Sequence, residues 1–216
     1  LFLVDAVESG GYGFDDKTAT AIYGLYTAAV FMAALPGGWI ADRLIGAQRA
    51  VMVGGTLMTL GTLMLTIPGP KQLFFGGLVV IILGVGLLKP NISAMVAQLY
   101  PGGGAARDAG FTLFYLGINV GAFIAPFITA AWIGATWGLK WGFFAAALGM
   151  ILSTLFLEVA KRSLGTVGLP PKGNEGWGRF FLVGFGALVM AIGVFFLLSA
   201  SRILGVLLIN IMMFVI

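Results

Sequence analysis

The sequence predicts an all-α polytopic membrane protein, and three observations carry that prediction. Hydrophobic residues make up 60% of the chain and charged residues only 9%, whereas a soluble domain carries about 25% charge. Apolar segments of about 20 residues, the length that crosses a bilayer, alternate with short polar or glycine-rich connectors. The segments also lack the alternation of polar and apolar residues that transmembrane β-strands show.

Seven apolar segments follow a short apolar stretch at residues 1–4, which we expect to be the tail of a helix rather than a signal peptide. The segments cover approximately residues 18–41, 50–67, 72–99, 110–133, 141–159, 179–199 and 203–216. The connector with a Pro-Pro pair, several glycines and mixed charge is typical of a break between units. We therefore expect an N-terminal transmembrane bundle at 1–160, a cytoplasmic linker at 161–178 and an incomplete transmembrane hairpin at 179–216.

Lysine and arginine residues divide unevenly between the two predicted sides of the membrane. One side has seven, namely Arg43, Arg49, Arg107, Lys161, Arg162, Lys172 and Arg179, and the other has Lys17, Lys71, Lys140 and Arg202. Cytoplasmic loops carry the excess of such residues, so the first side is predicted to be cytoplasmic. The net charge of +4 is spread singly along the chain, and no nucleic-acid-binding surface is indicated.

The types of residue present argue against an enzyme. The chain contains no cysteine and no histidine, which removes the commonest catalytic base and the thiolate and imidazole metal ligands. Glu158, at the end of a predicted span, is the acid that lies within the spans, so general acid–base chemistry lacks participants. No cofactor and no metal are implied, and we expect a multi-pass protein of the cell membrane.

Lys89 lies near the middle of an otherwise uncharged apolar run. A charged side chain at the centre of a span costs about 2.5–3.5 kcal/mol and usually faces a bundle interior or an aqueous cavity. Pro90 removes a backbone donor beside this charge and frees a carbonyl that a cavity or a neighbouring helix must satisfy. The charge and the kink together favour a functional site. The alternative is a lysine whose ammonium group reaches the headgroups.

The span at 110–133 carries a second candidate pair. Tyr115 and Asn119 are four residues apart and share one helical face, where a phenol and a carboxamide can meet a polar ligand. The alternative is structural, because Gly117 and Gly121 form a small-xxx-small pair and Asn119 can join two helices by a hydrogen bond.

A tight turn is predicted between the first two spans, in the string GGWIADRLIGAQR. An acid facing a base or a helix end across this turn would make a breakable latch, since exposed ion pairs contribute only ~0–1 kcal/mol. Ordinary loop charge is the alternative. The string resembles the G-x-x-x-D-R-x-x-G signature of the major facilitator superfamily. The residues of this gating motif are Gly38, Asp42, Arg43, Gly46 and Arg49.

Three strings together resemble the proton-dependent oligopeptide transporter family of that superfamily: ADRLIG (41–46), GLLKPNIS (86–93) and RDAGFTLFYLGINVGAFIAP (107–126). The resemblance implies the N-terminal half of a major facilitator transporter with a truncated first helix, followed by part of the helical hairpin that many bacterial members place between the halves. It also implies proton-driven import of di- and tripeptides by alternating access around a midplane site between the halves. The expected location is the bacterial inner membrane.

The resemblance also implies roles for particular residues. The family's lysine in this position serves proton coupling and peptide binding, which maps to Lys89, and the tyrosine and asparagine that contact the peptide map to Tyr115 and Asn119. Relatives often carry a tyrosine at the position of Phe31, so one hydroxyl contact is missing here. Tyr23 and Tyr26 are candidates to supply it, with helix packing as their alternative role.

The implied partners are small peptides, protons, the lipid bilayer and the C-terminal half of the same transporter. The family's E-x-x-E-R motif, which holds the acidic partner of the lysine, would lie upstream of Leu1. Without it, the residues present do not separate peptides from another small anionic or zwitterionic solute, such as nitrate or a single amino acid. A non-transporting membrane scaffold is the alternative from a different class, although a scaffold has no need of a buried lysine beside a proline.

Overall fold

The computed structural model describes residues 3–5 and 11–170, together with positions 185, 186, 189, 192, 193, 195 and 196. This part of the chain is helical and contains no strand. Five of its helices are long and apolar enough to cross a membrane, which confirms the predicted all-α polytopic fold class. The hairpin predicted at 179–216 lies almost entirely outside the described residues.

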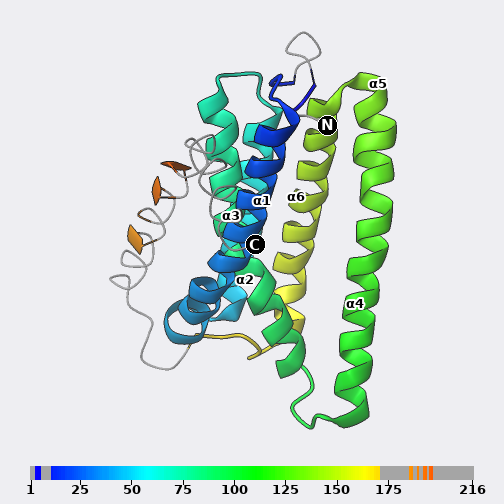
Figure 1. Cartoon of the computed structure of the whole chain (residues 1–216). Helices are drawn as coiled ribbons and strands as arrows, with labels where there is room; N and C mark the ends of the chain where they lie inside the picture. The colour runs from blue at the N-terminus through cyan, green and yellow to red at the C-terminus, as the bar shows by residue number, and fades with distance from the viewer. Residues whose placement is uncertain are drawn as a thin grey trace, which may run out of the picture.

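The long helices run side by side in alternating directions (Figure 1). Helix α1 (Asp16–Ile40) continues into a π-helical turn, η2 (Ala41–Ile45), and is followed by α2 (Ala47–Thr66), α3 (Lys71–Gln98), α4 (Gly104–Pro126) with its π-helical extension η3 (Phe127–Gly134), the short α5 (Ala135–Trp137), and α6 (Leu139–Leu164). The first five predicted spans are therefore confirmed.

Two of these helices are longer than predicted. Helix α4 begins at residue 104 rather than 110, and α6 ends at 164 rather than 159. The extension of α4 includes Arg107 and Asp108, and that of α6 includes Lys161 and Arg162. A search for apolar spans assigns such charged stretches to connectors. In α6, Lys161 of the extension forms an ion pair with Glu158 one turn earlier, with Lys161 Nζ 3.5 Å from Glu158 Oε1, as suits a helix that continues beyond the apolar zone.

The expected helical tail at residues 1–4 differs from the structure in its described part. Leu3, Val4 and Asp5 form a turn. The carbonyl groups of Leu3 and Asp5 accept hydrogen bonds from the N–H groups of Phe14 and Gly13, each at 2.9 Å. These two hydrogen bonds to the segment before α1 satisfy carbonyls that an α-helix would use within itself.

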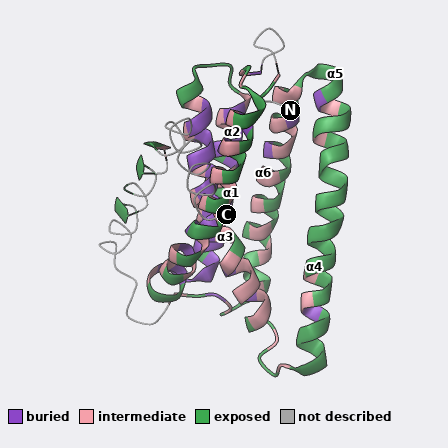
Figure 2. Ribbon diagram, viewed as in Figure 1, coloured by how far each residue is buried: buried purple, intermediate pink, exposed green. Residues whose placement is uncertain are grey.

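Most of the buried residues lie on α1, α2 and α3 (Figure 2). Helices α2 and α3 touch through two glycine pairs: a Cβ atom on Gly54 or Gly84 would lie 2.7 Å from the facing carbonyl oxygen, and one on Gly61 or Gly77 within 2.9 Å. Small residues let helix backbones approach closely in membranes, where no hydrophobic effect drives helices together. These three helices therefore form the compact part of the bundle.

Helix α4 is packed differently. Gly110 is its single buried residue, and the helix is exposed along nearly its whole length (Figure 2). It is held near its two ends, where Gly110 lies against the ring of Tyr100 and, in η3, the carbonyl of Thr129 lies against Gly142 of α6. The middle of α4 stands beside the compact part with little contact to it.

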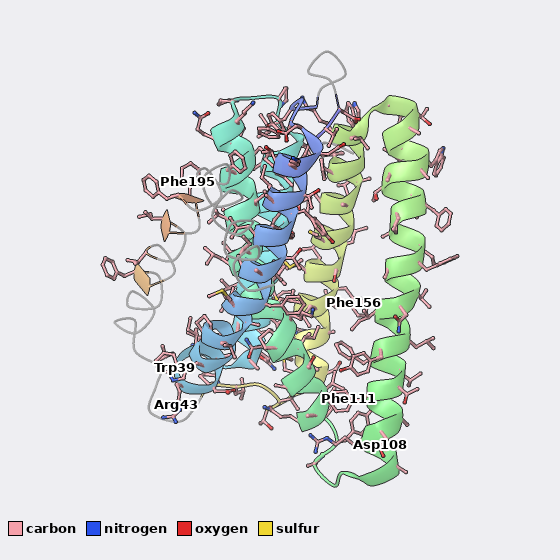
Figure 3. All side chains as sticks on the ribbon, in the orientation of Figure 1. Trp39, Arg43, Asp108, Phe111, Phe156 and Phe195 are labelled. Atoms are coloured by element: carbon pink, nitrogen blue, oxygen red, sulfur yellow. The ribbon has the colours of Figure 1, made fainter. Side chains whose placement is uncertain are left out.

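The alternating helix directions collect the basic residues at the ends of the bundle as the sequence predicted. Figure 3 shows Trp39 and Arg43 at the same end as Asp108. We call this the basic end, and its described lysines and arginines are Arg43, Arg49, Arg107, Lys161 and Arg162, while Lys17, Lys71 and Lys140 lie at the opposite end. Lys172, Arg179 and Arg202 lie outside the described residues.

Candidate functional site

The two helices that carry Lys89 and Phe31 cross at very small residues. A Cβ atom on Gly37 of α1 would overlap the carbonyl oxygen of Gly86 of α3, and one on Gly86 would lie 2.7 Å from Ala33. Gly86 is four residues before Pro90, which has no N–H to donate to the Gly86 carbonyl. The Cα of Gly37 therefore lies against the carbonyl that Pro90 deprives of its helical donor, in the manner of a Cα–H···O contact.

Asn91 fastens the same crossing from the other side. Its side chain is 1% exposed, and its Nδ2 donates to the carbonyl of Gly37 at 3.1 Å and to that of Leu87 at 2.6 Å. The bond to Gly37 joins α3 to α1 and favours one register of the two helices, because moving either helix would break a buried hydrogen bond. Asn91 was not among the predicted site residues. Its polarity inside an apolar span was the available signal.

Lys89 projects from this crossing and is exposed. Its Nζ lies 5.0 Å from the centroid of the Phe31 ring on α1. Phe31 is the sixteenth of the thirty residues in the continuous span Asp16–Ile45, so the ammonium group lies level with the middle of that span rather than at either end. This position fits a functional lysine better than one that reaches the headgroups.

Tyr23 and Tyr26 lie farther along α1, toward its N-terminus. Tyr23 is 68% exposed, while Tyr26 packs on the core cluster that contains Ile22, Phe74 and Leu78. Both tyrosines line a mainly apolar cavity of about 380 Å³. No contact given by the structure joins either phenol to Lys89 or Phe31, so these two tyrosines and the lysine occupy separate places on the bundle.

Tyr115 and Asn119 lie on the exposed part of α4. The Tyr115 ring stacks on Phe111 with centroids 6.3 Å apart, and the Arg107 guanidinium lies 6.0 Å from the Phe111 centroid. Asn119 Nδ2 donates to the backbone carbonyl of Tyr115 at 2.9 Å. Four residues at spacing i+4 thus form one continuous face. In the described residues Asn119 bonds to its own helix, and a Cβ atom on Gly117 or Gly121 would meet nothing within 4 Å.

A larger cavity of about 620 Å³ lies between α2, α4 and α6. Small side chains line it, including those of Gly55, Gly121, Ala145 and Gly149, and its polar lining comes from Thr129, Ser153 and Thr154. Thr154 donates to the carbonyl of Met150 on its own helix. The cavity is therefore an apolar space without a charged group, and it does not contain Lys89.

The gating motif lies in the turn between α1 and α2. Asp42 and Arg43 are exposed in η2, and Arg49 is exposed in the first turn of α2. Asp42 forms no ion pair with either of these arginines in the structure. Gly46 has φ +81°, a conformation in which glycine is strongly preferred, as expected for the predicted tight turn.

The connector after α6 packs against that turn. A Cβ atom on Gly46 would lie 2.5 Å from the backbone nitrogen of Pro170. The Gln48 N–H donates to the Gly168 carbonyl at 2.9 Å, and the Gly168 N–H donates to Gln98 Oε1 at 2.8 Å. The first residues of the predicted linker thus bind the start of α2 to the end of α3. The remainder of the linker, 171–178, lies outside the described residues.

Of the predicted site residues, the structure brings Lys89 and Phe31 together. Gly38 lies near Pro90, because a Cβ atom on Gly38 would lie 3.8 Å from Pro90 Cβ. Tyr115 and Asn119 share one face of α4. The charged residues of the gating motif lie at the basic end. The candidate residues therefore form separate groups on α1–α3, on α4 and at the turn after α1.

Antiparallel helices of this length and apolar composition define a multi-pass helical membrane protein. The POT family is matched by residues 48–174, and the chain belongs to this family. The resemblance to this family, inferred from the three sequence strings, is thereby confirmed. Membership also places the protein in the cell membrane and agrees with the expectation that it is not an enzyme.

Relatives with curated names include the peptide transporter YePEPT of Yersinia enterocolitica, which is 40% identical over 90% of this chain and 40% of its own length. The di-/tripeptide transporter of Lactococcus lactis subsp. lactis is 38% identical over 93% of this chain and 41% of its own length. The chain thus spans about two fifths of the length of these relatives.

Solved structures show the same fold. A crystal structure of a peptide transporter POT with sulfate is 38% identical, has a TM-score of 0.77 and is matched over 92% of this chain and 41% of its own. A POT family transporter in complex with 5-aminolevulinic acid is 33% identical, with a TM-score of 0.78 over 94% of this chain and 42% of its own. The helix arrangement described above is therefore that of POT transporters.

Proposed function

We propose that this chain forms part of a proton-coupled symporter that imports di- and tripeptides across the bacterial inner membrane. The observation that carries the proposal is the placement of Lys89 in a member of the POT family: an ammonium group at mid-span, carried by an exposed side chain of α3. A charge at that depth needs an aqueous or protein-lined cavity. The peptide-transporter names of the relatives support peptides as the substrate.

In the proposed mechanism, the Lys89 ammonium pairs in turn with a carboxylate on a preceding helix and with a carboxylate of the substrate. Protonation of the first carboxylate neutralises it and releases the lysine to bind peptide. Return of the proton to the cytoplasm lets the carboxylate recapture the lysine. Each ligand can shift the access equilibrium only by its difference in affinity for the two states, so the exchange of partners couples proton to peptide.

The exposed faces of α1 and α4, together with the exposed Lys89 of α3, support the second part of the proposal, which concerns the rest of the transporter. Transporters of this superfamily bind substrate at the midplane between two halves. The Lys89 and Phe31 surface and the Tyr115 and Asn119 face are exposed in the chain taken alone. We propose that a C-terminal half covers them and that a preceding helix fills the 620 Å³ cavity beside α4.

Within this reading, Lys89, Tyr115 and Asn119 contact the peptide, and the turn that contains Asp42 controls the switch between access states. Transport of another small anionic or zwitterionic solute is the alternative substrate class, and the names of the relatives favour it less. Lys89 does not support a scaffold without transport activity, because a scaffold would not need an ammonium group at mid-span.

The experiment is uptake of labelled dialanine by a full-length transporter that carries this sequence. Lys89→Gln keeps much of the side-chain length and removes the charge, so we expect accumulation driven by a pH gradient to fall to background while insertion in the membrane persists. Lys71→Gln is the matched control, because Lys71 lies on the same helix at its exposed end and also contacts a phenylalanine ring, that of Phe14 at 4.4 Å.

Accumulation by the Lys89→Gln variant that equals the unaltered protein, and still depends on the gradient, would contradict the coupling role. A wild-type protein that accumulates a single amino acid or nitrate but not dialanine would instead favour the alternative substrate class. Absence of any gradient-driven uptake by correctly inserted wild-type protein would favour the scaffold.

A further inference from the structure

We propose that Phe31 is a positioning residue for Lys89, which holds the lysine ammonium against the face of its ring while leaving the opposite side of that ammonium open to an anion. The proposal rests on the proposed function, because the anion would be the carboxylate of the peptide or of the acidic partner. It assigns Phe31 a role that the aromatic ring performs and that needs no hydroxyl group.

The distance supports an attractive contact. Lys89 Nζ lies 5.0 Å from the Phe31 centroid, within the ~6 Å at which an aromatic ring attracts a cation. In the described part of the chain, the ammonium has no hydrogen bond and no ion pair, and the Phe31 ring is the partner the structure gives it. Both residues are exposed, Phe31 by 62%, so neither is placed there by burial.

The backbone frame beneath the two side chains is rigid, and this makes the contact reproducible. Phe31 lies two residues before Ala33 and Lys89 three residues after Gly86, and those two residues touch at the α1–α3 crossing. Asn91 fastens the same crossing with its hydrogen bonds to Gly37 and Leu87. The distance between the Phe31 and Lys89 backbones is therefore fixed by packing, and the two side chains remain to be ordered.

A lysine side chain loses much rotamer freedom when it is held in one place. If the ring holds the ammonium before substrate arrives, part of that ordering cost is met in the free protein, and binding of a carboxylate is tighter. The ring contacts one side of the ammonium, and the N–H groups on the other side stay available as donors. An anion can therefore bind without displacing the ring.

The test changes the electrostatics of the ring and little else. In a full-length transporter that carries this sequence, Phe31 is replaced by mono-, di- and trifluorophenylalanine, which progressively reduce the negative charge of the ring face at nearly constant size. We expect KM for labelled dialanine to rise stepwise, reaching about two- to fivefold for the trifluoro residue, the range for an exposed cation–π contact. Phe31→Tyr keeps the aromatic ring and should leave KM close to that of the unaltered protein, and Phe31→Leu should raise it at least as far as the trifluoro residue.

The same fluorinated series at Phe156 of α6 is the matched control, because this side chain is 76% exposed and has no cation over its ring. No change in KM is expected there. A KM that is constant along the Phe31 series would overturn the proposal. So would a series in which Phe31→Leu raises KM but the fluorinated rings do not, because the ring would then contribute only its shape.

A second measurement does not depend on transport. Reductive methylation with ¹³C-formaldehyde keeps the lysine charge and gives an NMR signal that Lys89→Arg assigns by its disappearance. We expect the Lys89 signal to be shifted upfield by the ring current of Phe31 and to move toward the other lysine signals in Phe31→Leu. An unmoved signal contradicts the contact, whereas a moved signal in a protein that does not accumulate dialanine contradicts the proposed function alone.

Discussion

The α1–α3 crossing and helix α4 each carry part of the candidate site, and the two regions are packed in opposite ways. At the crossing, Gly37 and Gly86 bring the backbones together and a buried Asn91 joins them. On α4, Tyr115 and Asn119 stand on a helix with one buried residue, and Asn119 bonds to its own backbone. Both regions contain an asparagine in an apolar span, but only one of the two amides holds helices together.

This difference teaches that a polar residue in a span has no single meaning. Asn91 is enclosed because glycines on both helices let the backbones approach, so its amide serves the fold. Asn119 stands on an open face, and its amide remains available for another partner. We therefore expect substitutions at the crossing to act first on stability, and substitutions on α4 to act first on ligand affinity.

The largest effect is expected from Gly37→Ala. The new methyl group would overlap the Gly86 carbonyl, and separating the helices would break the Asn91 hydrogen bond and the contact between Phe31 and Lys89. Overpacking of this kind costs about 1–3 kcal/mol, occasionally more. The measurement is the melting temperature of the full-length protein in detergent, together with the yield of folded protein.

Gly24→Ala is the control on the same helix, since a Cβ atom there would meet nothing within 4 Å. An alanine is also a better helix former than glycine, so this variant should be no less stable than the unaltered protein. Equal melting temperatures for the two variants would mean that the close approach of Gly37 and Gly86 does not stabilise the bundle.

A smaller effect is expected from Asp42→Asn, because Asp42 lies neither at the α1–α3 crossing nor on α4. Asp42 is exposed at the basic end and forms no ion pair with Arg43 or Arg49, so the melting temperature should change little. If the turn controls the access equilibrium, the uptake rate should fall by up to about fivefold, the limit set by ~1 kcal/mol for an exposed charge interaction. Rate and dialanine affinity are measured together, and equal fractional losses of both would argue against a latch.

The sequence predicted the spans because their signal is local. A run of about 20 apolar residues must cross the bilayer in any tertiary arrangement, and the alternation of spans places the basic residues of alternate connectors at the same end. Lys89 and Pro90 were identifiable for the same reason, since a charge and a missing backbone donor are out of place in any apolar helix. Gly46 was also predictable, because a tight turn of this kind requires a residue that tolerates positive φ.

Which helix faces another could not be predicted from the sequence. The spacing of Tyr115 and Asn119 gives a shared face but not its exposure, and the spacing of Phe31 and Lys89 in the chain gives no distance between them. The clamp made by Asn91 and Gly37 depends on residues 54 positions apart. The contact of Gly168 with Gln48 and Gln98 likewise joins the linker to two distant helix ends.

The most direct test of the central claim compares two identical substitutions, Asn119→Ala and Asn91→Ala, in the full-length protein. Asn91→Ala removes two buried hydrogen bonds and should lower the stability by about 1–3 kcal/mol. Asn119→Ala removes an exposed bond to its own helix, so the melting temperature should stay within experimental error while dialanine affinity falls about two- to tenfold.

The two quantities are the melting temperature in detergent and the dissociation constant for dialanine, measured on the same preparations. We expect a loss of stability in Asn91→Ala and a loss of affinity without a loss of stability in Asn119→Ala. A melting temperature lowered as far by Asn119→Ala as by Asn91→Ala, with dialanine affinity unchanged, would mean that α4 is held by its asparagine and would contradict the division of roles between the two regions.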